Sequence, residues 1–295
     1  DGRQRQMCIR DSDMINMSAS DQFLFKEDNS CNLKPLVSLL LASYNHSLYV
    51  KQAIESIVNQ KGVTFELIVI DDGSTDDTKI LLNNFKKSAP FPVRIITQPN
   101  SGKHVAINTG VLAATRDWIF IVDSDDALTK DAIATIEKKL SEANSDMIVG
   151  LCFRKTYFDG RMIGRRASPG VLELTPTKAG ALLEGDLAYV FKRESMLKNP
   201  FPVIPGEKFV PELYVWNKIG DLGKIYFFAS KSICFCEYLQ DGYSLNFLSN
   251  LKKNPRGFFL FYKSQISRET SVLNKSRRLI RAFQCYLYIL REKIK

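Results

Sequence analysis

Three aspartates follow one apolar stretch of the chain within four residues. The stretch WIFIV (118–122) leads directly into Asp123, Asp125 and Asp126. Carboxylates this close together resist ionising unless a cation or hydrogen bonds compensate their charge. One interpretation is a strand end followed by a helix that Asp125 or Asp126 caps. The other is a metal site, in which Asp123 and Asp125 hold Mg²⁺ or Mn²⁺ against the phosphates of a ligand.

Two more polar stretches follow apolar runs in the same way. SYN (43–45) follows LVSLLLA, and DDGS (71–74) follows FELIVI. An aspartate such as Asp72 can accept a hydrogen bond from a uracil imide or from ribose hydroxyls. The neighbouring glycine lets the backbone approach a ligand closely. The alternative is that Asp71 and Asp72 only cap the next helix.

A fourth stretch, NSGKHVAINTG (100–110), places Gly102, Lys103 and His104 at the start of a predicted helix. Helix N–H groups together with a lysine side chain suit a phosphate. The alternative is a lysine that only contacts water. Together with the three strand ends, this stretch favours a binding cleft.

The apolar periodicity predicts alternating strands and helices that would position these residues. Strands are predicted at 36–42, 65–72, 93–97, 118–123 and 146–153, and helices from a Ser47 cap to about Gly62, around 80–85, at 103–115 and at about 130–143. Strands buried on both faces that alternate with helices are typical of a mostly parallel, doubly wound α/β sheet. In such sheets ligands bind beyond the carboxyl ends of the strands, where the polar stretches lie.

The alternation ends after about Phe153. Residues 157–175 predict a hairpin or a mobile loop over the cleft, 200–211 predict an irregular proline-rich loop, and 211–219 predict a helix. A final helix is predicted at 276–295. It is amphipathic, with one stripe formed by Leu279, Phe283, Leu287, Leu290 and Ile294 and with basic residues away from it at Arg278, Arg281, Arg291 and Lys295.

The charge of the chain is concentrated at one end. The net charge of +9 in 295 residues comes from residues 250–295, where twelve Lys and Arg stand against two Asp and Glu. Three interpretations are open for this segment: a helix that packs its apolar stripe on the domain, a contact with an anionic membrane surface, or nucleic-acid binding. No nucleic-acid module accompanies the charge, so we expect no nucleic acid as a partner.

The remaining composition is that of a soluble globular protein, with 45% apolar residues. The longest apolar run, 36–42, is far below the roughly 20 residues that span a membrane. No secretory signal precedes it, so we expect a cytoplasmic protein. Six cysteines without paired spacing and two histidines give neither a disulfide framework nor a zinc site. Cys234 and Cys236 are predicted to be a buried, reduced pair.

The four polar motifs resemble those of family 2 glycosyltransferases of the GT-A fold. The resemblance covers about residues 35–140 and rests on PLVSLLLASYN, ELIVIDDGSTDDT, NSGKHVAINTGVLAA and DWIFIVDSDDAL, which occur in the family's order and spacing. GEKFVPELYVWNKIG and EYLQDGYS, within 206–244, also resemble bacterial family 2 enzymes that build surface polysaccharide.

The resemblance implies a role for individual residues. Residues implied to bind the donor are Ser43, Tyr44, Asn45, Asp72, Gly102, Lys103, Asn108, Asp123 and Ser124. Asp125 would be the direct metal ligand, and Asp123 would lie nearer the ribose while also serving the metal. The family's usual Thr before Tyr-Asn is replaced by Ala42-Ser43, so a hydroxyl contact to the base from position 42 is not expected.

At the general base the sequence departs from the family's pattern. The family usually supplies it from a Glu-Asp pair, whereas this chain has Pro211-Glu212. Aligning Trp216 with the family's aromatic residue, which would contact the acceptor, places Glu212 on the base. Glu207 is the competing candidate, and Glu212 as a mere first-turn acid is the alternative to a catalytic role.

The resemblance implies an inverting, metal-dependent transfer from a UDP-sugar or another nucleotide-sugar donor to an acceptor hydroxyl. The acceptor would be a glycan or a lipid-linked sugar in bacterial cell-surface polysaccharide or glycolipid synthesis. The alternatives are a non-catalytic nucleotide-sugar-binding protein and a nucleotidyltransferase.

The expected organisation has three parts. Residues 1–33 form a disordered or non-native tail. Residues 34–240 form the GT-A domain, with a nucleotide-sugar half at about 34–155 and an acceptor half at about 156–240. Residues 241–295 form a basic helical extension, which would be peripheral at the inner face of the cell membrane if the membrane interpretation holds.

Overall fold

The computed structural model of the chain describes residues 36–60, 64–143, 147–168, 170–238 and 246–294. The predicted tail (1–33), most of the EYLQDGYS motif and Lys295 lie outside these residues. All described residues belong to one compact unit, Pro35–Lys295, and the boundary expected near residue 240 stays a prediction.

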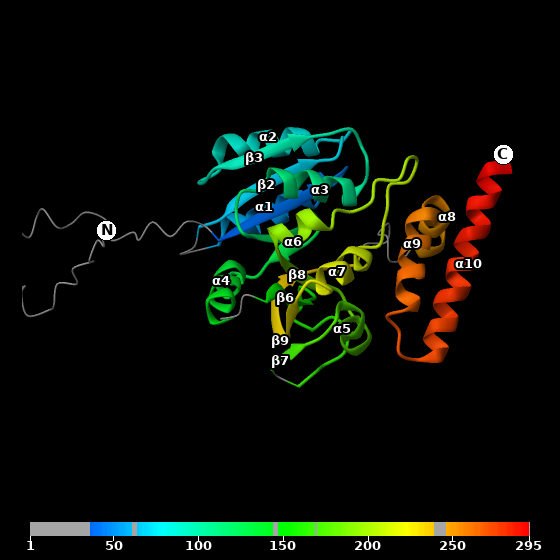
Figure 1. Cartoon of the computed structure of the whole chain (residues 1–295). Helices are drawn as coiled ribbons and strands as arrows, with labels where there is room; N and C mark the ends of the chain where they lie inside the picture. The colour runs from blue at the N-terminus through cyan, green and yellow to red at the C-terminus, as the bar shows by residue number, and fades with distance from the viewer. Residues whose placement is uncertain (1–35, 61–63, 144–146, 169, 239–245, 295) are drawn as a thin grey trace, which may run out of the picture. The chain divides into compact units, whose positions relative to one another are not determined.

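The first half of the chain is a parallel sheet with alternating helices (Figure 1). Its elements are β1 (Val37–Ser43), α1 (Val50–Val58), β2 (Glu66–Asp71), α2 (Thr78–Ser88), β3 (Val93–Thr97), α3 (Lys103–Ala113) and β4 (Trp118–Asp123). The strands lie in the order β3-β2-β1-β4, all parallel. The strand order therefore reverses between β1 and β4, and this is where such a sheet opens a crevice for a ligand.

The second half extends the same sheet with strands of both directions. Its elements are β5 (Ala127–Leu128), α4 (Ala132–Glu142), β6 (Ile148–Thr156), β7 (Val171–Glu173), α5 (Pro176–Leu183), β8 (Leu187–Lys192), α6 (Arg193–Lys198), α7 (Leu213–Gly220) and β9 (Lys224–Phe235). β8 lies between β4 and β6 and is antiparallel to both, whereas β6 and β9 are parallel. The predicted mostly parallel α/β fold is confirmed, with β8 as an inserted antiparallel strand.

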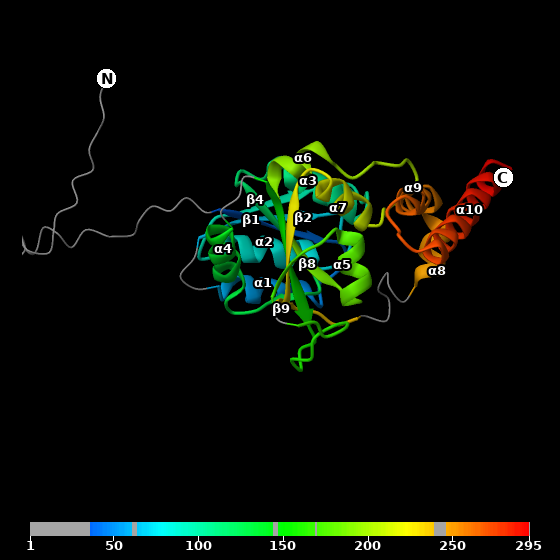
Figure 2. The same cartoon turned by 60° about the horizontal axis from the view of Figure 1, so that its bottom comes forward.

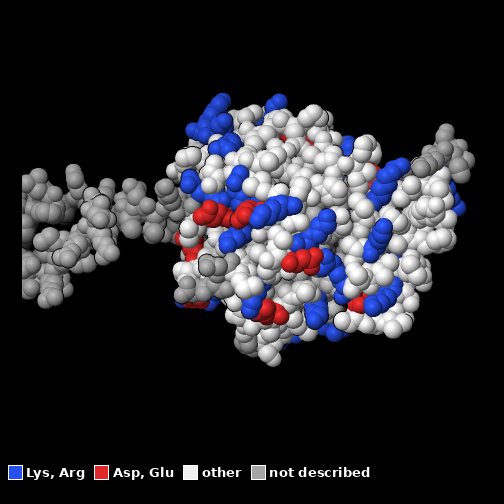
Figure 3. Space-filling view, in the orientation of Figure 1, with Lys and Arg blue, Asp and Glu red and all other residues white. Residues whose placement is uncertain are grey.

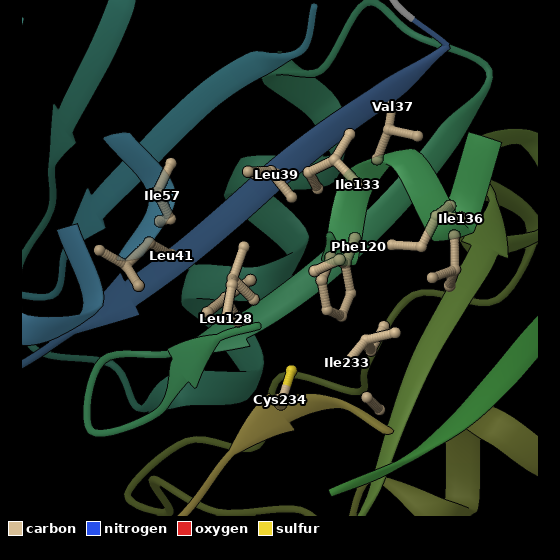
Figure 4. Close-up of a cluster of buried hydrophobic side chains, with 14 of the residues drawn as sticks. Val37, Leu39, Leu41, Ile57, Phe120, Leu128, Ile133, Ile136, Ile233 and Cys234 are labelled. Carbon is tan, nitrogen blue, oxygen red and sulfur yellow. The ribbon is translucent and has the colours of Figure 1, made fainter. Parts of the chain in front are cut away.

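Helices cover both faces of the sheet (Figure 2). Leu39 and Leu41 of β1 pack in a buried cluster with side chains of α1, α2 and α4, part of which is drawn in Figure 4. Leu40, which points to the opposite face, belongs to a second cluster with α3, α5, α6 and α7. Both faces of β1 are therefore buried, as its near-continuous apolar sequence predicts.

Three helices follow the sheet: α8 (Phe247–Lys253), α9 (Pro255–Ile266) and α10 (Val272–Ile294). They share a small buried core, the C-terminal cluster, made of Leu251, Phe258, Tyr262, Ala282 and Cys285. The final helix begins four residues earlier than predicted. The interpretation that its apolar stripe packs on the domain is wrong, because Leu279, Phe283, Leu287 and Leu290 are all exposed.

Two predicted helix caps are also wrong. The N-cap residue of α1 is Tyr49 and not Ser47, whose backbone N–H instead donates to Asp76. The N-cap residue of α4 is Asp131, so neither Asp125 nor Asp126 caps this helix. Cys234 and Cys236 are buried and free, which confirms the reduced pair.

Candidate active site

Side chains from the carboxyl ends of β1, β2 and β4 line one cleft of about 750 Å³. The first half of the chain contributes Ser43, Tyr44, His46, Asp72, Gly102, Lys103, Asp123, Ser124, Asp125 and Asp126, among others. The second half contributes Lys155, Asp186, Tyr189, Glu212, Trp216, Cys236 and Tyr238, among others. The reversal of strand order between β1 and β4 explains why these residues meet, since the connections diverge there and leave a gap.

Lys103 joins the acidic strand end to the predicted base. Its Nζ lies 2.5 Å from Asp123 Oδ1 and 2.6 Å from Glu212 Oε1. Burial opposes the charge on this lysine, but the two carboxylates outweigh it and raise the pKa of Lys103 well above its ordinary value. The pKa of Asp123 is held well below its usual range, because Lys103 and Lys155 together outweigh the effect of burial. The two predicted halves of the site therefore meet at one ammonium group.

A second lysine, Lys155 at the end of β6, compensates the other side of the acidic cluster. Its Nζ is 2.5 Å from Asp126 Oδ2 and 3.4 Å from Asp123 Oδ2. Burial raises the pKa of Asp126 to about 6, although Lys155 opposes this shift. Sequence reasoning missed Lys155. The charged pair Arg154-Lys155 directly after an apolar run was the available signal, since charges within a buried strand need partners.

Asp125 differs from its two neighbours. No Lys or Arg among the described residues forms an ion pair with it. Burial and then the charge of Asp123 raise the pKa of Asp125, while His46 opposes the shift. One oxygen each of Asp123, Asp125 and Asp126 lies within 4.8 Å of the others. Three hard carboxylates, of which the half-buried Asp125 has no ion pair with a described lysine or arginine, fit Mg²⁺ or Mn²⁺. Lys103 and Lys155 already pair with Asp123, and Lys155 pairs with Asp126, so Asp125 is the carboxylate of the three that has no ion pair in the described part of the chain.

Asp72 shapes the wall of the cleft. Its Oδ1 accepts hydrogen bonds from Gln98 Nε2 (2.7 Å) and Ser101 N (2.9 Å), and its Oδ2 accepts one from Gly102 N (2.7 Å). The interpretation that Asp72 caps α2 is wrong, because its bonds go to the turn before α3. Asp71 instead accepts from Ser74 N. Contact of Asp72 with a base or a ribose stays a prediction.

Residues 43–45, at the carboxyl end of β1, divide between the cleft and a neighbouring turn. Ser43 is buried and lines the cleft, and its Oγ has no hydrogen-bond partner among the described residues. Tyr44 lines the cleft and is exposed. Asn45 has φ 51° and its Oδ1 accepts from Thr75 N, so it fixes the neighbouring turn. The orphaned Ser43 hydroxyl is a ready partner for a polar ligand.

His46 is a cleft residue that sequence reasoning did not identify. Its Nδ1 lies 2.6 Å from Ser124 Oγ, which fixes the serine between Asp123 and Asp125. The position of a histidine directly after the SYN motif was a signal.

Two predicted site residues, Asn108 and Trp216, have structural partners. Asn108 does not line the cleft; its side chain forms hydrogen bonds with both the carbonyl and the N–H of Phe201. Trp216 lines the cleft but is almost fully buried against Phe191 and Tyr189. An acceptor could contact only the small part of the Trp216 side chain that lines the cleft.

Glu207 also lies in a structural position. It is buried outside the cleft lining, and its carboxylate accepts hydrogen bonds from Arg256 N (2.7 Å) and Gly257 N (2.8 Å) at the start of α9. Burial raises the pKa of Glu207 in spite of these bonds. Glu212 is in the cleft, about one-third exposed and paired with Lys103. Of the two candidates, Glu212 is the one that a ligand can reach.

Comparison with known proteins identifies relatives for this arrangement. The sequence profile described as glycosyl transferase family 2 matches residues 38–192. An uncharacterised glycosyltransferase of Nostoc is 26% identical over 57% of this chain and 54% of its own length. The hyaluronan synthase of Pasteurella multocida is 34% identical over 46% of this chain and 14% of its own length. The chain thus spans only part of the curated relatives it matches.

Solved structures share the fold. TarS (1–349) of S. aureus in complex with UDP-GlcNAc superposes with a TM-score of 0.62 at 17% identity, covering 85% of this chain and 72% of that one. The mannosyltransferase PcManGT of Pyrobaculum calidifontis, in complex with GDP-Man and Mn²⁺, gives a TM-score of 0.54 at 16% identity over 93% of this chain and 81% of that one. Among the described helices of this chain, none is both long and apolar enough to cross a bilayer.

Proposed function

The chain belongs to glycosyl transferase family 2 and is a glycosyltransferase, and on this premise we propose that it transfers a sugar from a nucleotide diphosphate sugar to an acceptor hydroxyl with inversion. The observation that carries the proposal is the contact of Lys103 with both Asp123 and Glu212. Asp123 would lie beside the nucleotide-sugar donor, and Glu212 would be the base that faces the acceptor. Because both carboxylates contact the ammonium group of Lys103, the leaving group and the acceptor would lie close together, as a direct displacement requires. Family membership argues against the non-catalytic and nucleotidyltransferase alternatives.

The donor half of the cleft suits a nucleotide diphosphate. Asp123 and Asp125 would hold Mn²⁺ or Mg²⁺, which when bound neutralises charge on a departing diphosphate. Ser43, Tyr44 and Asp72 line the side where the nucleoside would lie. UDP is the leading nucleotide, and the TarS complex with UDP-GlcNAc supports this choice by fold alone.

Glu212 is the proposed general base. Lys103 holds its Oε1, so Oε2 can take the proton of the acceptor hydroxyl as the sugar is transferred. Glu212 precedes α7 (Leu213–Gly220), and that helix packs in the core through Val215 and Ile219. The base therefore stands on a rigid element.

The proposed acceptor is a glycan or a lipid-linked sugar of the bacterial cell surface. Its half of the cleft is lined by Asp186, Leu213, Trp216 and Tyr238, a mixture of carboxylate and aromatic side chains that suits a sugar. The relatives named hyaluronan and chondroitin synthases support a polysaccharide product. We propose a cytoplasmic location at the inner face of the membrane.

The experiment is a screen of nucleotide sugars for a thermal shift and for released nucleotide diphosphate, with and without Mn²⁺. Asp125→Asn is expected to raise the Mn²⁺ concentration needed for donor binding. Glu212→Gln is expected to keep donor binding and lose roughly 10²–10⁴ in kcat. Asp159→Asn and Glu194→Gln, which change exposed carboxylates elsewhere, are the matched controls.

Each part of the proposal has its own contrary result. Turnover that survives Glu212→Gln would remove Glu212 as the base. Turnover by the unmodified chain in the presence of a chelator would show that the reaction does not require a metal. If no nucleotide sugar shifts the melting temperature while a free nucleoside triphosphate does, the donor class itself is wrong.

A further inference from the structure

α10 presents its apolar residues to solvent rather than to α8 and α9. Ile280 is 66% exposed and Phe283 60% exposed, although both are large and apolar. The face turned toward the other helices carries the small residues Ala282 and Cys285, which are buried. Arg278 on that inner side pairs with Glu269. The helix thus has the reverse of the usual arrangement, in which the apolar face is buried.

The exposed residues form one continuous face along the helix. The outward face of α10 consists of Val272, Leu279, Ile280, Phe283, Tyr286, Leu287 and Leu290, all exposed. Steps of three and four residues bring them to one side, over about 27 Å at 1.5 Å per residue. In both Figure 1 and Figure 2, α8 and α9 lie on one side of α10 and no described element lies on the other.

The charges next to this face are all of one sign. Lys275, Arg277 and Arg291 are exposed on α10, and between Glu269 and Glu292 the sequence contains no Asp or Glu. Figure 3 shows Lys and Arg bordering uncharged surface in this part of the molecule.

The charge pattern decides between two occupants of the face. If a second copy packed its α10 on this face, parallel or antiparallel, the same cations would lie against Lys275, Arg277 and Arg291. Residues 270–291 contain no Asp or Glu that could pair with them. An anionic lipid surface offers phosphates to the flanking cations and an apolar layer to the stripe. We propose that the outward face of α10 binds an anionic membrane surface, with the helix lying in the plane of the headgroups.

This inference stands on α10 alone and does not depend on the proposed function. The probe is the full chain sedimented with vesicles of phosphatidylcholine, with or without phosphatidylglycerol. We expect pelleting only with the anionic vesicles and release by high salt, because surface charges are screened. Replacing Lys275, Arg277 and Arg291 by Gln should weaken binding by roughly a hundredfold, at about fivefold for each charge.

The apolar contribution is tested with a matched pair of triple variants. Ile280→Ser, Phe283→Ser and Leu287→Ser together should weaken vesicle binding at least about tenfold. Ile80→Ser, Leu112→Ser and Val203→Ser remove large exposed apolar side chains from other parts of the fold and should leave binding unchanged. Thermal unfolding of both variants checks that the fold is intact.

Three results would overturn the proposal. The first is equal pelleting with neutral and anionic vesicles. The second is unchanged pelleting after the Ile280, Phe283 and Leu287 substitutions. The third is a dimer in sedimentation equilibrium that these three substitutions dissociate while vesicles bind neither form, which would make a second copy the occupant.

Discussion

Gly102 lies where the loop before α3 contacts the loop before α7. Its φ of 94° is in the region that favours glycine, and a Cβ there would collide with the carbonyl of Lys208. Gly102 therefore allows the loop before α3 to pack closely against the loop before α7, in addition to any contact that it makes with a phosphate. The need for glycine at this position follows from a residue more than one hundred positions away.

Gly102→Ala is expected to destabilise the fold by about 2–5 kcal/mol, from backbone strain and from the collision together. Urea unfolding measures the change. Gly160→Ala is the matched control, because Gly160 has a similar φ of 85° with no atom within 4 Å of a Cβ; it should cost about 1 kcal/mol. Equal losses in the two variants would show that the contact with Lys208 is unimportant.

His104 is buried beside Gly102, with its ring against Phe201. Burial lowers the pKa of His104 below its ordinary value, and the charge of Asp72 only partly opposes this. As the pH falls, the imidazole of His104 is therefore protonated at a higher pH in the unfolded chain than in the folded chain. The stability that the neutral imidazole contributes is complete above about pH 6.5 and is lost as the pH falls through the lowered value in the folded chain.

We accordingly expect the unfolding free energy to fall between pH 7 and pH 5 more steeply in the unmodified chain than in His104→Gln. Urea titrations at a series of pH values give the two slopes. Carboxylates that titrate in the same range contribute equally to both chains, so the difference isolates His104. Parallel slopes would mean that the imidazole is protonated as easily when folded as when unfolded.

At the scale of elements, Glu207 ties the proline-rich loop to the start of α9. The loop, predicted as irregular, carries a buried carboxylate that accepts two backbone N–H groups which the helix itself leaves unpaired. Negative charge at a helix N-terminus also interacts favourably with the helix dipole. The loop between α6 and α7 is thus one attachment point of the C-terminal helices, in addition to the ion pair of Arg268 with Asp221.

Glu207→Gln should lower the unfolding free energy by about 1–3 kcal/mol, because an amide N–H₂ would face a backbone donor. Glu194→Gln, an exposed acid on α6, is the control and should change stability little. Below the melting temperature of the variant, turnover should persist. A loss of turnover as large as that of Glu212→Gln, with stability unchanged, would instead identify Glu207 as the base.

At the scale of the whole molecule, the chain has cores of unequal size. Two large clusters occupy the two faces of the sheet, whereas the C-terminal cluster has five buried residues in the described part of the chain. Regions with few buried apolar contacts open at lower free energy.

Native-state hydrogen exchange should therefore show the amides of α9 and α10 opening at lower free energy than those of β1 and β4. The comparison within one molecule is its own control, since global unfolding sets the same upper limit for all amides. Equal opening free energies for the two sets would show that the C-terminal helices and the sheet unfold as one unit.

Much of the first half could be predicted, because its signals are local. Strands β1, β2 and β4 are apolar runs of strand length, and the helices between them have regular periodicity. The second half was predicted less well. β8 was not identified, because an antiparallel strand inserted between β4 and β6 pairs with residues about 40 and 70 positions away. Local pattern contains no information on that pairing.

The sequence by itself determined that Asp72, Asp123 and Asp125 follow strand ends, and that parallel strands would bring them to one edge of a sheet. Only the tertiary structure decided their partners: Lys103 with Glu212, Lys155 with Asp126, and Asp72 with the turn before α3. It also decided the direction of α10. Periodicity shows that a helix has an apolar face, but which face is buried depends on the neighbours, and here the small residues Ala282 and Cys285 allow the closer packing.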